Sequence, residues 1–172
     1  MSKAEEHFRL ALQNALKLNH VHSLGNGYNN MGVIKIMQGK LDSVMYFLVK
    51  GKEVRQKLND IPNLSGSYNN IALYYNEVKK YDLALKNADT SMQLANRVQT
   101  KTELIEVLDT YYNIYEKIGD YKNALRCYRQ RQEILKEIKN KQIDKKMSEY
   151  ESGFNLQKKQ EELNQSKTQL LL

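Results

Sequence analysis

Apolar residues along the chain recur at steps of three and four positions. One run holds Tyr68, Ile71, Ala72 and Tyr75, and the next begins at Tyr81. This spacing places the apolar side chains on one face of a helix. No segment alternates apolar and polar residues for long enough to predict a strand. The pattern therefore predicts an all-α chain of amphipathic helices.

The pattern repeats every 40 residues. Leu24, Leu64 and Leu104 open segments that align without a gap, and the aligned positions keep their chemical character. A fixed interval of this length is typical of a solenoid of stacked repeats. Each interval holds two helical patterns, so we expect antiparallel helix pairs. We predict a solenoid over residues 1–140, with a half repeat at 2–20 and full repeats at 21–60, 61–100 and 101–140.

Cap signals fall at the expected junctions. Gly39 and Gly119 follow the first helical pattern of their repeats, where glycine commonly ends a helix. Thr100 and Glu103 have the spacing of a capping box, which predicts reciprocal side-chain hydrogen bonds at the start of a helix. Pro62 lies near the first turn of another helix, where proline is tolerated.

The solenoid pattern begins in the middle of a repeat, so we expect the chain to be part of a longer protein. An open half repeat exposes apolar residues that a preceding repeat would cover. We expect Phe8, Leu12 and Leu16 to be accessible to a partner at this end.

The repeats resemble tetratricopeptide repeats over residues 2–140. The resemblance is clearest in the second full repeat, where the family slots hold Tyr68, Ile71, Ala72, Tyr75, Ala84, Ala88 and Ser91. The family's common unit is shorter than 40 residues. The chain is therefore most similar to the long-repeat branch found in kinesin light chain and in bacterial regulators and sensor histidine kinases. The resemblance implies a right-handed superhelical solenoid that binds peptides or partner domains.

The resemblance also implies a concave groove lined by one stripe of the first helix of each repeat. A carboxamide both donates and accepts hydrogen bonds, so asparagines on this stripe could hold the backbone of an extended peptide. Asn30 and Asn70 lie on a neighbouring column and in this family often bond the adjacent repeat instead. The predicted groove residues are Asn26, Asn29, Asn69, Asn76, Asp109, Asn113 and Glu116.

Residues beyond 140 lose the 40-residue pattern but keep a helix-forming composition. Ile143, Met147, Tyr150 and Phe154 share one stripe, and we expect the first part of residues 141–172 to be a helix that caps the last repeat. The second part predicts a coiled-coil or linker helix, because leucines recur there at intervals of seven. These leucines are Leu156, Leu163 and Leu170.

The net charge of +7 is concentrated at the C-terminal end, where residues 121–172 carry +5. A nucleic-acid site would need a basic stripe interleaved with exposed aromatic residues, and the sequence shows none. We expect no nucleic-acid partner. No apolar run reaches the roughly 20 residues that span a bilayer, although a membrane segment outside this chain is compatible with the Leu170–Leu172 end.

Catalytic and metal-binding motifs are lacking. Gly25, Asn26 and Gly27 have no following lysine and no preceding strand, so they do not form a phosphate loop. Cys127 fits a small packing residue better than a reactive thiol, and His20 and His22 have no partners at metal-ligand spacing. We predict a protein that is not an enzyme and has no cofactor or metal.

The sequence therefore predicts a peptide- or protein-binding scaffold, as the sensory or regulatory module of a larger bacterial signalling or transcription-regulating protein. The alternative is a structural role in which the solenoid ends and the C-terminal helix form homo-oligomers. Nucleic-acid binding through the basic C-terminal helices ranks third. The compartment stays open, with the cytoplasm favoured over a membrane-tethered or periplasmic setting.

Overall fold

The computed structural model describes residues 3–18 and 20–170, and these residues form helices and no strands. They divide into two compact units, residues 1–131 and 132–172, which we describe separately. The helices are α1 (Lys3–Lys17), α2 (Val21–Met37), the 3-10 turn η1 (Leu41–Ser43), α3 (Val44–Lys57), α4 (Ile61–Glu77), α5 (Tyr81–Val98), α6 (Lys101–Lys117) and α7 (Tyr121–Leu170). Helices α2, α4 and α6 begin 40 residues apart, as the sequence pattern predicts.

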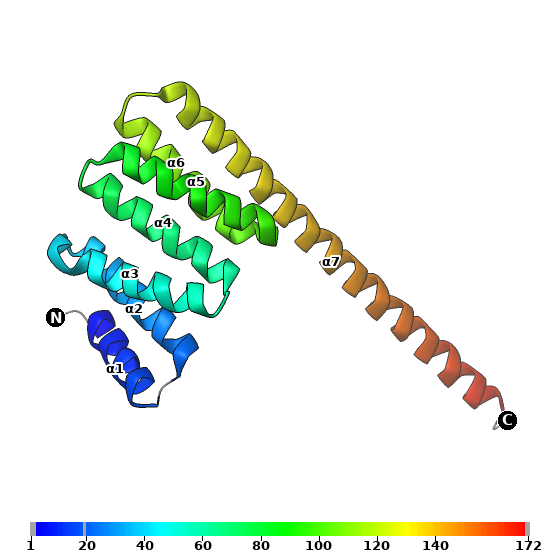
Figure 1. Cartoon of the computed structure of the whole chain (residues 1–172). Helices are drawn as coiled ribbons and strands as arrows, with labels where there is room; N and C mark the ends of the chain where they lie inside the picture. The colour runs from blue at the N-terminus through cyan, green and yellow to red at the C-terminus, as the bar shows by residue number, and fades with distance from the viewer. Residues whose placement is uncertain (1–2, 19, 171–172) are drawn as a thin grey trace. The chain divides into compact units, whose positions relative to one another are not determined.

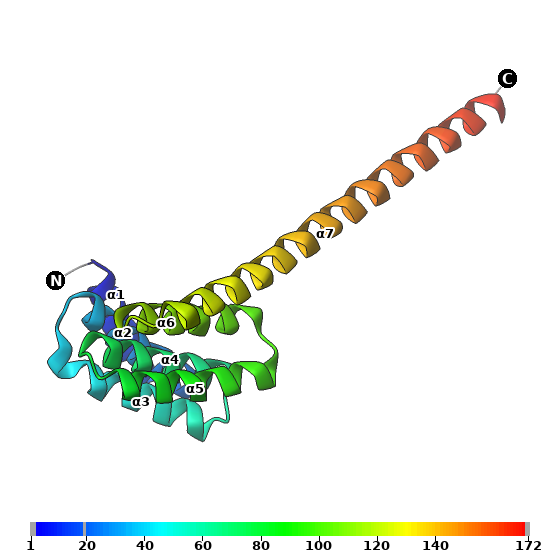
Figure 2. The same ribbon diagram turned by 90° about the horizontal axis from the view of Figure 1, so that it is seen from above.

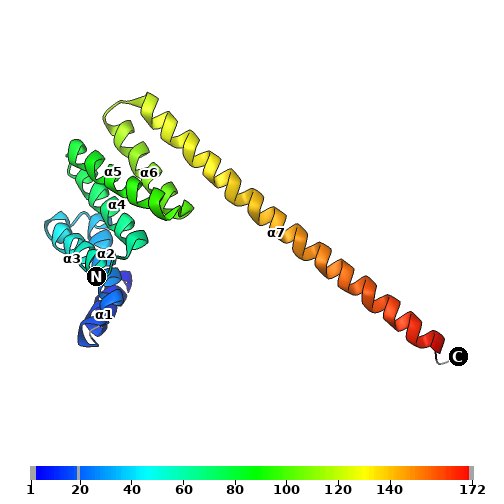
Figure 3. The same ribbon diagram turned by 45° about the vertical axis from the view of Figure 1, so that its right-hand side comes forward.

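The first unit is built from helix pairs that follow one another in chain order (Figures 1 and 3). Helix α2 packs on α3, and α4 packs on α5. Helices α2, α4 and α6 also contact one another in succession, so they form one layer. Figure 2 shows α3 and α5 on the other side of the unit from α6. This all-helical repeat architecture is the one that the sequence predicts.

Residues with positive φ angles follow the ends of α2 and α6, at the two glycines that the sequence predicts as helix ends. Gly39 has φ +68° and Gly119 has φ +79°, a conformation that costs glycine no steric strain. After α2 the Lys40 N–H donates to the Lys35 carbonyl at 2.9 Å, which closes the last turn. Lys79 occupies the equivalent position after α4 with φ +59°.

The capping box predicted at α6 is wrong. Thr100 is the N-cap residue, but its side chain makes no cap hydrogen bond. Thr100 Oγ1 and Glu103 Oε2 are both buried without a hydrogen-bond partner, because the Glu103 side chain faces a groove instead of the helix start. At the equivalent position before α4, Asp60 Oδ1 accepts from the Asn63 N–H at 3.4 Å.

Small residues let paired helices approach closely. Between α4 and α5, Ser65 Oγ donates to the Ser91 carbonyl and Ser91 Oγ donates to the Ser65 carbonyl, both at 2.9 Å. Between α2 and α3 the corresponding positions hold Gly25 and Gly51, and a Cβ on Gly51 would lie 3.2 Å from the Gly25 carbonyl oxygen. The α2–α3 pair therefore has no room for side chains where the two helices cross.

The first unit has a core cluster at the junction of its first two full repeats. Val44, Leu48 and Ile71 are buried together in it. Gly32 faces Leu48 so closely that a Cβ on Gly32 would lie 2.4 Å from Leu48 Cδ2. One repeat later the two positions hold Ala72 and Ala88, which are both fully buried.

The N-terminal half repeat is more covered than the sequence predicts. Leu12 is only 8% exposed, since it packs against the glycine face of α2 at Gly27. The expectation that Leu12 is accessible is therefore wrong, while Leu16 is exposed as expected. Glu5 ties α1 to α2, accepting from Lys35 Nζ at 2.6 Å and from Gln38 Nε2 at 3.0 Å.

Helix α7 presents apolar side chains to solvent over much of its length. Tyr121 is exposed on the first turn of the helix. The stripe of Ile143, Met147, Tyr150 and Phe154 is exposed too, so its predicted capping role stays a prediction. The side chains of Leu163 and Leu170, on which the coiled-coil prediction depends, lie outside the described residues.

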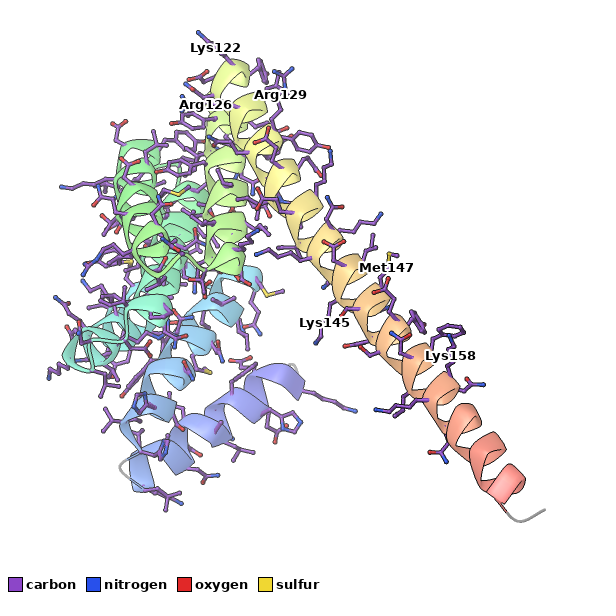
Figure 4. The ribbon with its side chains drawn as sticks, turned by 90° about the vertical axis from the view of Figure 1, so that its right-hand side faces the viewer. Lys122, Arg126, Arg129, Lys145, Met147 and Lys158 are labelled. Carbon is purple, nitrogen blue, oxygen red and sulfur yellow. The ribbon has the colours of Figure 1, made fainter. Side chains whose placement is uncertain are left out.

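Basic side chains are distributed along the same helix. Lys122, Arg126 and Arg129 lie on the first turns of α7, and Lys145 and Lys158 lie further along (Figure 4). Within the described residues, no helix is both long and apolar enough to cross a membrane.

Candidate functional site

A groove of about 470 Å³ runs across the layer formed by α2, α4 and α6. Its volume lies in the range of about 300–1,000 Å³ that is typical of ligand sites. Three successive repeats contribute to it, with Asn29 from α2, Asn69 from α4 and Asn113 from α6. The lining is mainly polar, so the groove suits a ligand that offers hydrogen-bonding groups along its length.

Two buried asparagines line the groove, and only one of their two side-chain amide oxygens accepts a hydrogen bond. Asn29 and Asn69 are 6% and 5% exposed. Asn70 Nδ2 donates to Asn29 Oδ1 at 3.1 Å, which ties the second full repeat to the first. The equivalent of Asn70 in the third repeat is Thr110, whose hydroxyl donates to the Glu106 carbonyl at 3.1 Å. Asn69 Oδ1 is consequently buried without a hydrogen-bond partner.

Arg55 from α3 lies at the boundary between repeats and contributes its guanidinium to the groove wall. Its Nη1 donates to Ser67 Oγ at 2.7 Å and to the Asn63 carbonyl at 2.9 Å, and its Nη2 donates to Asn26 Oδ1 at 3.0 Å. Its Nε has no partner. Burial lowers the pKa of Arg55, and the nearby Asp60 carboxylate opposes that shift. An arginine remains charged under such a shift, so Arg55 is a buried cation.

Helix α6 forms an acidic wall on the far side of the groove. Glu103, Glu106 and Asp109 all line it. Burial raises the pKa of Glu106, and the neighbouring carboxylates of Glu103 and Asp109 raise it further. Arg131 Nε lies 2.6 Å from Asp109 Oδ1, so one of the three carboxylates already has a counter-charge.

A second, more apolar compartment of about 430 Å³ lies between α1 and α2. Phe8, Ala15 and Leu18 line it, and Asn30 lines both compartments. In the 40-residue register Ala15 is the equivalent of Arg55. The second compartment is therefore the same groove one repeat earlier, with an alanine in place of the buried arginine.

The structure brings together four of the seven predicted groove residues. Asn29, Asn69, Asp109 and Asn113 line the central groove, whereas Asn26 lines the α1 compartment and bonds Arg55. A ligand contact for any of them stays a prediction.

Asn76 and Glu116 do not line the groove, contrary to the prediction. Asn76 is buried with Oδ1 unpartnered, and Glu116 is exposed and accepts from the Tyr112 hydroxyl at 2.9 Å. Both share a column with Ile36, which packs against the core cluster. At this end of the helices the column turns from the groove toward the helix packing.

Sequence reasoning missed Arg55 and Glu103. Arg55 stands in a column that otherwise holds Ala15, Ala95 and Leu135, and a packing slot for an apolar residue gives no reason to expect a ligand-facing residue. The single arginine in an apolar column was the available signal. Glu103 was assigned to a capping box instead.

Other reactive groups offer little chemistry. Cys127 is buried, and burial raises the pKa of its thiol. His20 caps α2 by accepting from the Ser23 N–H at 3.4 Å. In the part of the chain that the structure describes, no three His, Cys, Asp or Glu side chains are grouped so that they could hold a metal ion.

Comparison with known proteins places these repeats in a family. Residues 64–137 match a family model described as tetratricopeptide repeat. The crystal structure of BtubC (BKLC) from P. vanneervenii resembles the chain with a TM-score of 0.65 and 17% sequence identity. The likeness covers 78% of this chain and 56% of that chain, and at this identity it shows the fold alone. The search of curated proteins gave no match.

The matched segment begins at Leu64, inside α4, and contains α5, α6 and the start of α7. The α2–α3 pair on its N-terminal side precedes the α4–α5 pair by the same 40-residue interval. Residues 64–137 are therefore tetratricopeptide repeats, a type of repeat that typically serves as a non-enzymatic scaffold for protein interactions.

Proposed function

We propose that the chain binds an extended peptide segment of a partner protein in the groove across α2, α4 and α6. The observation that carries this proposal is the pair of buried, incompletely bonded polar groups on the groove wall, Asn69 Oδ1 and Arg55 Nε. Buried polar groups are nearly always hydrogen-bonded, so unpartnered polar groups on the lining of one groove favour a polar occupant. An extended backbone supplies both donors and acceptors.

The test is a steric block that leaves the fold intact. A Cβ on Gly66 would meet no atom within 4 Å, although Gly66 lines the groove. We expect Gly66→Tyr to fill the groove without disturbing helix packing. Gly153→Tyr is the matched control, because Gly153 also has open space around it and lies outside the groove.

The probe is a library of random linear peptides, selected on the immobilised chain. We expect enriched peptides to bind the parent chain and the Gly153→Tyr variant equally, and to lose binding to Gly66→Tyr. Far-ultraviolet circular dichroism checks the fold of each variant. The proposal fails when no peptide is enriched, or when the enriched peptides bind Gly66→Tyr as tightly as the parent.

Asparagine substitutions complement this test, but Asn29→Ala is a poor choice. It would remove the acceptor of the Asn70 hydrogen bond and weaken the contact between repeats. Asn113 is an exposed groove residue, so Asn113→Ala reports on binding with little effect on stability.

We also propose that the module acts without catalysis, as the regulatory interaction part of a larger bacterial protein. This finer proposal is supported by the family resemblance of the long repeats alone. Sequencing the natural reading frame on both sides of the chain tests it. An adjoining kinase or DNA-binding domain would support it, and an open reading frame limited to these residues would refute it.

A second candidate function is self-association through the exposed stripe on α7. Ile143, Met147, Tyr150 and Phe154 follow one another at steps of four, three and four residues, which is the seam spacing of a two-stranded coiled coil. Light scattering over a concentration series should then show a dimer that Met147→Ser with Phe154→Ser abolishes. Lys158→Ser serves as the control. A mass that is monomeric throughout, or unchanged by the paired substitution, excludes this function.

A further inference from the structure

The groove is not uniform in charge along the solenoid. In the 40-residue register Glu103 and Glu106 replace neutral residues of the first two repeats, namely Asn63 and Gly66 in α4. Asp109 likewise replaces Asn69. The acidic wall is thus a property of α6 alone, within a chain whose net charge is +7.

Neither of the two arginines at the groove pairs with Glu103 or Glu106 in the part of the chain that the structure describes. Arg131 pairs with Asp109, and this pair accounts for one of the three carboxylates. The Arg55 guanidinium directs its Nη atoms to Asn26, Ser67 and the Asn63 carbonyl, all of them on α2 and α4. Glu103 Oε2 is buried without a hydrogen-bond partner.

The unsatisfied groups near α6 are acceptors. Asn69 Oδ1, in a residue that is only 5% exposed, needs a donor, and so does Glu103 Oε2. Glu106 stands between two other carboxylates, and like charges at such a position repel one another until a cation enters. A ligand group that carries several N–H donors and a positive charge meets all three requirements.

We propose that the α6 end of the groove selects a basic side chain, lysine or arginine, of the bound peptide. This inference rests on the proposed function and names the chemistry of the partner. The basic group lies against Glu103 and Glu106 and donates to Asn69 Oδ1, while the peptide backbone passes Arg55. The basic net charge of the chain repels basic peptides elsewhere, so attraction is confined to the groove.

The experiment uses the peptides selected from the random linear library, with affinities measured by fluorescence anisotropy. The test variant is Glu103→Gln with Glu106→Gln, which keeps side-chain size and leaves the Asp109–Arg131 pair in place. The control is Glu53→Gln with Glu149→Gln, which changes the net charge equally but alters two exposed carboxylates paired with Lys50 and Lys145.

We expect enriched peptides to share a lysine or arginine and to bind the test variant about ten-fold more weakly than the control variant. Raising the salt concentration should weaken binding to the parent and narrow this difference. Circular dichroism and thermal unfolding verify that the test variant is folded. If the test variant does not fold, the basic residue of the peptide is replaced by glutamate instead. This peptide should bind the parent chain at least ten-fold more weakly than the original peptide does.

The inference and the proposed function fail in different ways. Enriched peptides without a basic residue, or equal affinity for the test and control variants, overturn the basic selectivity. If enriched peptides without a basic residue still fail to bind Gly66→Tyr, the proposed function stands and the groove remains the binding site. An absence of enriched peptides overturns both.

Discussion

The contact between Gly32 and Leu48 predicts that Gly32→Ala destabilises the chain when residue 48 is leucine and stabilises it when residue 48 is alanine. A Cβ on Gly32 would lie 2.4 Å from Leu48 Cδ2 and 2.8 Å from Leu48 Cγ, and Leu48 is fully buried. Overpacking of this kind costs about 1–3 kcal/mol, whereas replacing a helical glycine by alanine gains about 1 kcal/mol. We therefore expect Gly32→Ala to destabilise the chain by about 1 kcal/mol.

In the Leu48→Ala background the same change should stabilise. Leu48→Ala alone should cost about 2–5 kcal/mol through the cavity that it leaves. In this background the Cβ added by Gly32→Ala no longer clashes with the side chain at position 48. The change then gains about 1 kcal/mol of helix propensity and returns one methyl group to the cavity. Ala72 and Ala88 already form this pair in the next repeat, both fully buried. The expected coupling energy is about 2–3 kcal/mol.

Urea unfolding followed by circular dichroism measures the four members of this cycle. Gly66→Ala is the control, since its Cβ would meet no atom within 4 Å and should stabilise by about 0.5–1 kcal/mol. The reasoning is refuted when Gly32→Ala has the same effect in both backgrounds, because the clash with Leu48 would then not determine its cost.

Three further predictions concern single sites. The pairing of Glu5 with Lys35 lowers the pKa of Glu5 from 4.5 to about 2, so its contribution to stability is present above pH 4.5 and is lost as the pH falls toward 2; acid unfolding of Glu5→Gln should lack this component, and an unchanged acid profile would contradict it. Lys79→Gly should raise the free energy of unfolding by about 0.5–1 kcal/mol, because Lys79 has φ +59°; a loss of stability in urea would count against this. Cys127 should react with a thiol reagent only in denaturant, since it is buried; fast reaction of the native chain would disprove it.

Helix boundaries could be predicted well because they depend on local signals. The 40-residue interval and the glycines at positions 39 and 119 locate helix ends without knowledge of the packing. The capping box at Thr100 failed for the opposite reason. Its spacing is correct, but Glu103 lies at a groove, and tertiary surroundings decided which way the side chain turns.

Among the predicted groove residues on α4 and α6, only those on the last helical turn do not line the groove. Asn29, Asn69 and Asp109 lie near the middle of their helices and line the groove, whereas Asn76, on the last turn of α4, does not. A repeat register gives the face of one helix, but the angle between successive helices changes which turns of that face meet the groove. Arg55 comes from the other helix layer, so a stripe drawn on α2, α4 and α6 could not include it.

The buried guanidinium of Arg55 has a consequence for the modular use of this sequence. Because the full repeats have equal length, one 40-residue repeat can be deleted or duplicated without moving a helix boundary. Removing residues 61–100 would bring α3 against α6, and the position of Ser67 would then hold Val107. Arg55 would lose a buried hydroxyl acceptor and face an isopropyl group at the boundary between the repeats. The repeats are thus ordered: the first full repeat accepts only a successor that carries a polar residue at this position.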